Sequence, residues 1–473
     1  MKSLEPDICV IGAGSAGLSI AAGASQMGAE TVLIEKAEMG GDCLNYGCVP
    51  SKSLLVAGRA AQAWRHTAAF GIDTPEPSVD FARVHAHVRD VIDGIAPLDS
   101  VERFTGLGVD VIQAAAAFED ARTVVADGAR IRAKRFVIAT GSRPSLPPIE
   151  GLDRVAYLTN ETVFSLTERP DHLIVIGGGP IGSELGQAFR HLGARVSLVE
   201  MGGILQNDDP ELVEVVRRRL TRDGVELYEQ AKVARVDAAG NGVAVTIERE
   251  GHEERIEGSH LLLAAGRQPT VEGLGLDMAG IAYDRRGIKT DARLRTSNKR
   301  VYAAGDVASG PQFTHMAGHH AGIVIKNALF RLPAKVETKA VPWVTYTEPE
   351  LAHVGLTEAM ARKAGQQINL LRWDFHENDR ARAERQTEGL CKVVVTPKGK
   401  ILGASIAGPQ AGELIQPWVL AIANGLKISA MAQLIAPYPT LGEVSKRAAG
   451  SFYTPKLFSE RTKKIVRLLL RLP

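Results

Sequence analysis

The chain has 473 residues, enough for about two to four domains, and 45% of them are hydrophobic. A formal net charge of +2 argues against a nucleic-acid surface, and four cysteines are too few for a disulfide-stapled secreted protein. The polar N-terminus does not resemble a signal peptide, and no apolar run reaches membrane-spanning length. We therefore expect a cytoplasmic protein with no membrane span and no nucleic-acid partner.

The first predicted elements form a strand–turn–helix unit. An apolar run at residues 8–11 precedes a glycine-rich turn at residues 12–17 and an Ala-rich helical segment. A second apolar run, at residues 31–34, ends in Glu35. Glycines permit a tight turn and let a pyrophosphate approach the helix N-terminus, while the acid would hold a ribose hydroxyl pair. This spacing predicts a dinucleotide-binding fold.

Two cysteines follow, Cys43 and Cys48, five positions apart, and Lys52 stands four positions after the second. Such a spacing can close a small disulfide at the start of a helix, where helix-terminal amides and an ammonium both favour thiolate. A disulfide that closes so short a loop would add little stability to a long chain, so we favour a redox-active pair over a structural one. A zinc site would need two further ligands nearby, and none has suitable spacing. We therefore predict no metal site.

Residues 53–69 are predicted to form a helix that carries this pair at its start. Residues 81–104 are predicted to form one long, charged surface helix, and residues 136–140 a buried strand. His85 and His87 on the long helix are expected to be solvated, because no acid or cysteine ligand stands at helical spacing from them.

The nucleotide-binding pattern then recurs. An apolar run at residues 173–176 precedes a glycine turn at residues 177–182, and a helix is predicted to about Leu192. The next strand, residues 195–199, is closed by Glu200. Two dinucleotide folds with a cysteine pair between them suggest that electrons pass from one cofactor to another and then to sulfur.

This ordered set of motifs resembles the class I pyridine nucleotide–disulfide oxidoreductase family, on its dihydrolipoamide dehydrogenase and mercuric reductase branch. The match covers nearly the whole chain. Besides the two glycine turns and the cysteine stretch, it rests on residues 139–144, 265–269 and 302–307. The resemblance implies an α/β fold with two Rossmann-like dinucleotide-binding domains, for FAD and NAD(P), and an α+β C-terminal dimerisation domain.

By this resemblance, residues 1–150 and 269–341 form the FAD-binding domain and residues 151–268 the NAD(P)-binding domain. Residues 342–473 form the interface domain, which in relatives builds a two-fold dimer, so we expect a homodimer. Within it, residues 392–395 and 401–406 are predicted to be antiparallel strands joined by a hairpin.

The resemblance also assigns site residues. Cys48 would be the thiolate beside the flavin and Cys43 the outer thiol that exchanges with substrate. Lys52 would stabilise negative charge, with Glu184 fixing it. FAD is expected to contact Gly12, Gly14, Gly17, Glu35, Lys52, Gly141, Asp306 and Ala317. NAD(H) is expected to contact Gly177, Gly179, Gly182, Glu200 and Gly266. The helix-start histidines are expected to pack rather than catalyse: His315, His319 and His320.

Glu200 favours NAD(H) over NADP(H). A carboxylate at the strand end accepts hydrogen bonds from a ribose 2′-hydroxyl and repels a 2′-phosphate. Residues 201–208 contain no arginine or lysine that would receive such a phosphate.

The C-terminal stretch departs from the best-known relatives. Disulfide reductases carry a histidine there that moves a proton between substrate thiol and solvent, followed by an acid that orients it. Here Tyr438 takes the histidine's place, while Glu443 keeps the acid's. A phenol with a pKa near about 10 is a poor base at neutral pH, although it can donate a hydrogen bond or contact a metal. Tyrosine at this place is a feature of mercuric reductases, but the terminal cysteine pair usual in those enzymes is absent.

Three interpretations of the reaction follow. We favour a small dithiol or disulfide of the dihydrolipoamide type as the substrate. Reduction of Hg(II) or another soft metal is the first alternative, and an NADH oxidase or quinone-type electron transfer is the second. The tail from Arg461 is basic and amphipathic, so we expect it to pack on the interface domain, with weak membrane-surface contact as the alternative.

Overall fold

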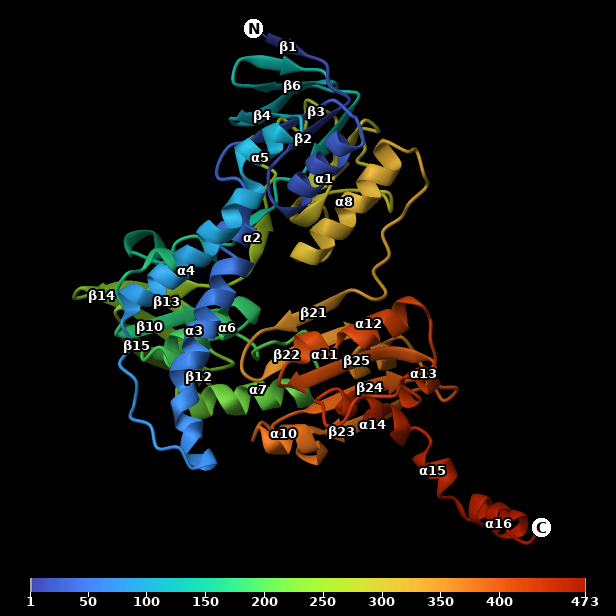
Figure 1. Cartoon of the computed structure of the whole chain (residues 1–473). Coiled ribbons are helices and arrows are strands. Elements are labelled where there is room, and N and C mark those ends of the chain that lie inside the picture. The colour runs from blue at the N-terminus through green and yellow to red at the C-terminus, as the bar shows by residue number, and fades with distance from the viewer. Residues whose placement is uncertain (1, 473) are drawn as a thin grey trace. The chain divides into compact units, whose positions relative to one another are not determined.

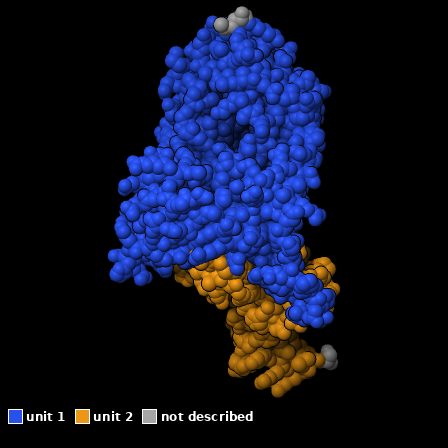
Figure 2. Space-filling view, turned by 90° about the vertical axis from the view of Figure 1, so that its left-hand side faces the viewer, with its two compact units in different colours: residues 1–201, 227–337 blue, residues 202–226, 338–473 orange. Residues whose placement is uncertain are grey.

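The computed structural model describes residues 2–472. The chain forms two compact units, Met1–Met201 with Leu227–Glu337, and Gly202–Glu226 with Thr338–Pro473 (Figure 2). The domain boundaries expected from the sequence stay predictions. Segment 202–226, expected in the NAD(P) domain, belongs to the second of these units. Within residues 2–472, every helix is too short or too polar to traverse a lipid bilayer.

A parallel five-stranded sheet is the centre of the N-terminal part of the first unit (Figure 1). Its strands read as continuous apolar runs because parallel strands are covered on both faces. In sheet order they are β20 (Val301–Ala303), β8 (Arg135–Ile138), β2 (Ile8–Ile11), β3 (Thr31–Glu35) and β4 (Val109–Gln113). Two helices pack together on the sheet, α1 (Ser15–Gln26) and α8 (Thr314–Ala328). An outer sheet adds β1 (Lys2–Leu4), β7 (Ala129–Ile131), β6 (Thr123–Ala126) and β5 (Ala116–Asp120).

The same architecture recurs later in the first unit. Strand β10 (His172–Ile176) pairs in parallel with β11 (Arg195–Val199) and β16 (His260–Leu263). Helix α6 (Pro180–His191) follows β10, and an antiparallel sheet is formed by β13 (Lys232–Ala239), β14 (Gly242–Arg249) and β15 (His252–Gly258). The mixed α/β class predicted from the sequence, with its two strand–turn–helix repeats, is confirmed.

Two predicted helices differ from the structure. Helix α3 runs over Cys48–Thr67, so it begins at the second cysteine rather than after it. The single helix predicted over residues 81–104 is wrong. It divides into α4 (Phe81–Ile95), a 3-10 turn (Ala96–Asp99) and α5 (Val101–Gly106). Pro97 stands in the turn, and the Ser100 side chain accepts a hydrogen bond from the Arg103 amide to start a new helix.

The second unit is built on an antiparallel sheet. Its strand order is β21 (Pro342–Thr345), β22 (Glu350–Gly355), β25 (Ile401–Gly408), β24 (Leu390–Val395) and β23 (Asn369–Asp374). The predicted pairing of β24 with β25 is confirmed as antiparallel. The core on this sheet includes the fully buried Trp418 of α12 (Gln416–Ala423) and Val444 of α14 (Glu443–Ser451).

A buried lysine joins helix α7 (Pro210–Asp223) to this sheet. The Lys392 side chain is 4% exposed, and its ammonium lies 2.8 Å from Asp209, 3.0 Å from Glu211 and 2.9 Å from Glu358. Asp209 also caps α7, because its carboxylate accepts a hydrogen bond from the Glu211 amide. The sheet and the helix are thereby connected through one cation.

The C-terminal tail does not pack as expected. Two short helices end the chain, α15 (Thr454–Leu457) and α16 (Glu460–Leu469). No residue of α16 is buried, and Figure 1 shows it extending away from the sheet of its own unit. The expected packing of this tail on the interface domain is therefore wrong for the described chain.

Candidate active site

A cavity of about 930 Å³ opens in the first unit, within the range of cofactor pockets. Many of the sequence-predicted residues line it: Gly12, Gly14, Glu35, Cys43, Gly141, Asp306 and Ala317. Gly17 and Lys52 are not among the lining residues. The cavity therefore runs from the first glycine turn to Cys43, while Cys48, expected to be the cysteine beside the flavin, is not among its lining residues.

At two positions of the first glycine turn, no residue larger than glycine fits. A Cβ at Gly12, whose φ is +105°, would lie 2.4 Å from the Ala139 carbonyl oxygen. A Cβ at Gly17 would lie 1.8 Å from the Gly12 carbonyl oxygen. Both approaches are too short for any other residue, so the turn stays narrow enough for a pyrophosphate to reach the start of α1.

Glu35 is held at the end of β3 by backbone amides. One carboxylate oxygen accepts from the Ala13 amide at 2.6 Å and the other from the Ala37 amide at 2.8 Å. The acid lies beside the turn at the edge of the cavity, where a ribose would bind.

A chain of polar side chains leads from Asp306 to the residue before Cys43. The Ser142 hydroxyl donates to Asp306 at 2.7 Å, and the Arg267 Nε donates to Ser142 at 2.8 Å. The Arg267 guanidinium also lies 3.2 Å from the Asp42 carboxylate. Burial raises the pKa of Asp306, while Ser142 and Arg267 lower it. A carboxylate that lines a large cavity, together with narrow glycine turns, fits the ribityl and pyrophosphate parts of FAD.

The two cysteines lie together as free thiols. The Cys43 thiol donates a hydrogen bond to the Cys48 sulfur, and Cys48 lies 3.3 Å from the Thr314 hydroxyl. The pKa of Cys48 is lowered to about 6, first by the bond from Cys43, then by Thr314 and the Lys52 ammonium. Donation to Cys48 raises the pKa of Cys43. At neutral pH the pair therefore holds one thiolate and one thiol.

Thr314, which the sequence analysis did not select, is expected to control this thiolate. Thr314→Val removes a hydroxyl that donates to the thiolate form, so the pKa of Cys48 is expected to rise from about 6. Alkylation of the reduced enzyme with iodoacetamide, located by fragment mass spectrometry, reports this pKa as the midpoint of rate against pH. Thr314→Ser keeps the hydroxyl and is expected to keep the midpoint. An unchanged midpoint in Thr314→Val would contradict the role.

Lys52 and Glu184 form the predicted pair. The Lys52 ammonium lies 2.7 Å from the Glu184 carboxylate, whose side chain is 7% exposed. The pair joins α3 to α6, which pack closely, since a Cβ at Gly58 would lie 3.2 Å from the Ala188 carbonyl oxygen. Glu184 therefore fixes a cation one helical turn beyond Cys48.

The second glycine turn repeats the geometry of the first. A Cβ at Gly177 would lie 2.5 Å from the Ala264 carbonyl oxygen, and a Cβ at Gly182 would lie 1.9 Å from the Gly177 carbonyl oxygen. The Glu200 carboxylate accepts from the Gly178 amide at 2.7 Å. Gly179 faces open space, and Gly266 has a φ of +110°. These features fit a second dinucleotide.

Tyr438 and Glu443 lie in the second unit. Tyr438 is 70% exposed, and its hydroxyl donates to the Asp379 carboxylate at 3.1 Å. This bond raises the pKa of Tyr438, so less of the phenol is ionised at neutral pH than of a free one, and little phenolate is present to accept a proton. Glu443 begins α14. Asp379, which precedes them by about 60 residues, was not selected from the sequence.

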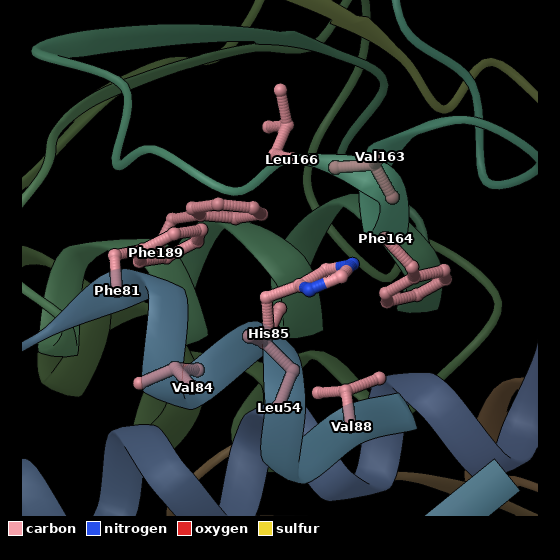
Figure 3. A pocket seen from close by; sticks show the side chains of 9 residues that line it. All are labelled: Leu54, Phe81, Val84, His85, Val88, Val163, Phe164, Leu166 and Phe189. Atoms are coloured by element: carbon pink, nitrogen blue, oxygen red, sulfur yellow. The ribbon is translucent and has the colours of Figure 1, made fainter. Parts of the chain in front are cut away.

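A small apolar recess of about 10 Å³ lies between α3, α4 and α6 (Figure 3). His85 lines it together with Phe81, Phe189 and Leu54, while His87 is exposed. The recess has room for no more than one water. No group of three or more potential metal ligands occurs among residues 2–472.

Comparison with known proteins assigns the family. Residues 6–321 match the pyridine nucleotide-disulphide oxidoreductase family, and residues 341–449 match its dimerisation domain. The chain therefore belongs to the pyridine nucleotide–disulphide oxidoreductases, as the sequence motifs predicted. It is an FAD-dependent NAD(P)H–disulfide oxidoreductase that acts on a sulfur group.

Relatives with two different names are similar to this chain over most of its length. A mercuric reductase of Lysinibacillus sphaericus is 37% identical over 449 residues, 94% of this chain and 82% of the relative. A dihydrolipoyl dehydrogenase of Bacillus subtilis (strain 168) is 37% identical over 459 residues, 94% of this chain and 96% of the relative. The HOCl-induced flavoprotein disulfide reductase RclA from Escherichia coli superposes with a TM-score of 0.84 at 28% identity, covering 94% of this chain and 99% of that one.

Proposed function

We propose that this chain passes electrons from NADH to a small disulfide of the dihydrolipoamide type, and in reverse oxidises the corresponding dithiol with NAD⁺. The unequal pair of Cys43 and Cys48 carries the proposal, because thiol–disulfide exchange needs one thiol to attack and a second to resolve. FAD supplies two-electron transfer between the pyridine nucleotide and the Cys43–Cys48 disulfide.

The hydrogen bond between the two cysteines supplies a base where Tyr438 cannot. As Cys43 attacks a substrate sulfur, its proton passes along this bond to the Cys48 thiolate. The Cys43–substrate bond forms, the substrate disulfide breaks, and the leaving sulfur takes a proton from solvent. Cys48, with its pKa near 6, then attacks the Cys43 sulfur as its proton passes to the departing substrate sulfur. The second substrate thiol leaves, and the cysteines end as a disulfide, so two electrons and two protons have moved to the substrate.

A soft metal is the second candidate. Tyr438 replaces the proton-transferring histidine of disulfide reductases, and relatives named mercuric reductase match 94% of the chain. An acceptor panel with NADH separates the candidates: lipoamide, small disulfides, Hg(II) with excess thiol, quinones and oxygen. We expect the highest kcat/KM with lipoamide. Faster turnover of Hg(II) would favour the metal, and faster turnover of quinone or oxygen would contradict a cysteine-dependent reaction.

We expect kcat/KM with NADH to exceed that with NADPH by about tenfold or more, because Glu200 lies where a 2′-phosphate would bind. Glu200→Gln removes the negative charge but keeps an acceptor for the Gly178 amide. It is therefore expected to bring the kcat/KM values for NADH and NADPH closer together, chiefly by lowering the KM for NADPH. Steady-state rates with both nucleotides measure this. Higher efficiency of the unmodified enzyme with NADPH would refute the assignment.

A homodimer is part of the proposal, supported by the match of residues 341–449 to the dimerisation domain. The cytoplasmic location expected from the sequence stays a prediction.

A further inference from the structure

The C-terminal tail, residues 457–472, exposes more apolar surface than a helix of a soluble domain usually does. Its aliphatic side chains are 47–79% exposed: Ile465, Val466, Leu468, Leu469, Leu470 and Leu472. The core of the unit ends before this segment, since Phe452 and Tyr453 pack against the core and no residue of α15 or α16 is buried. Exposed apolar patches of this kind mark surfaces that bind something.

The helix is formed before any partner arrives. Ser459 caps α16 by accepting from the Thr462 amide at 3.2 Å. The Thr462 hydroxyl donates to the Lys456 carbonyl oxygen at 2.7 Å, which ties the start of α16 to the end of α15. A capped helix needs less ordering on binding, so its apolar face is available as a rigid surface.

Charge and apolar character lie on opposite faces of α16. Ile465, Leu468 and Leu469 stand at the i, i+3 and i+4 positions of one face, and Leu472 continues this spacing past the helix end. The opposite face holds most of the charge: Glu460, Lys463, Lys464, Arg467 and, past the helix end, Arg471. Arg461 stands one helical turn before Ile465, at the N-terminal end of the apolar face, and in all the tail carries five cations against one acid. Only a partner that is apolar inside and anionic at its surface satisfies both faces at once.

We propose that residues 457–472 dock the protein on an anionic lipid surface. A basic amphipathic helix lies in the plane of such a surface, with its aliphatic side chains among the acyl chains and its cations among the phosphates. Long lysine and arginine side chains reach the headgroups from the sides of the helix. A second copy of the chain is the competing occupant. It is disfavoured because the dimerisation-domain match ends at residue 449, and because the cations would gain no partner from an apolar contact.

Flotation of the full-length flavoprotein with vesicles tests this proposal. We expect binding to vesicles of equal parts phosphatidylglycerol and phosphatidylcholine, weaker binding at high salt, and none to phosphatidylcholine alone. Leu468→Asp/Leu469→Asp and Lys464→Glu/Arg467→Glu are each expected to lower the bound fraction about tenfold. Leu332→Asp, a matched change at a 51% exposed leucine of the other unit, is expected to bind as the unmodified protein does.

Light scattering and NADH-dependent turnover in solution are measured on the same samples. We expect every variant to keep the oligomeric state and the turnover of the unmodified protein, because α16 contributes no core contact. Dissociation of the oligomer in Leu468→Asp/Leu469→Asp would show that a second copy covers the helix and would overturn the proposal. Equal binding to neutral and anionic vesicles, or no flotation at all, would overturn it as well. These readouts do not depend on which acceptor the enzyme uses.

Discussion

Cys43→Ser is expected to abolish turnover of a disulfide substrate while NADH still bleaches the bound flavin. Serine cannot form the mixed disulfide, so the exchange stops at its first bond. Its hydroxyl still donates to Cys48, which keeps the hydrogen bond that lowers the pKa of that thiolate most. The expected loss in kcat for lipoamide is about 10³-fold or more, in the range seen when a covalent nucleophile is removed. Stopped-flow reduction by NADH and steady-state assays measure the two steps separately.

Cys43→Ala is the matched control. It removes the same nucleophile and also the hydrogen bond, so disulfide turnover is lost in both variants, but only in Cys43→Ala is the pKa of Cys48 expected to rise. The midpoint of Cys48 alkylation against pH distinguishes them. Full disulfide turnover in Cys43→Ser would contradict the assigned roles of both cysteines. Retained turnover of quinone or oxygen alone would point to electron transfer that bypasses the pair.

The parts of the site that are local in sequence could be predicted from the sequence. Each glycine turn lies directly between a buried strand and a helix, and its acid closes the next strand, so spacing alone identifies it. The cysteine pair likewise lies within one short stretch. Thr314 could not be found in this way, and neither could the contact that Arg267, which stands in one of the recognised motifs, makes with Asp42. Thr314 reaches Cys48, and Arg267 reaches Asp42, from more than 200 positions away along the chain, and only the packing of α8 and of the strand after Gly266 brings them there.

Two errors have different physical origins. The helix break at Pro97 could have been predicted from the sequence, because proline disfavours the helical conformation of the residue before it and has no amide hydrogen to donate. The exposure of α16 could not have been predicted from the sequence. An amphipathic pattern shows that one face will be covered but does not identify what covers it. The sequence therefore predicts the helix, and the structure shows that the rest of this chain leaves it uncovered.

Lys392→Met is expected to destabilise the second unit by about 3–5 kcal/mol, the usual cost of removing one partner from a buried ion pair. Glu211 and Glu358 each have a second cation, Arg372 at 2.8 Å and Arg362 at 2.9 Å. Asp209 is 4% exposed and has no second cation among residues 2–472. In the variant its negative charge would stay buried at the start of α7 with the hydrogen bond from the Glu211 amide but without a cation. Thermal unfolding of the holoenzyme, followed by the fluorescence of its four tryptophans, among them the buried Trp418, measures the loss.

Two further variants distinguish the effect of leaving the Asp209 charge buried from the effect of losing a lysine side chain. Lys398→Met, in the exposed hairpin between β24 and β25, is expected to change stability by no more than about 0.5 kcal/mol. Lys392→Met/Asp209→Asn removes both charges, and asparagine still caps α7, so much of the lost stability is expected to return. If the double variant unfolds at the same temperature as Lys392→Met, the destabilisation comes from lost packing of the lysine stem. If it recovers, the ammonium holds α7 on the sheet by neutralising Asp209.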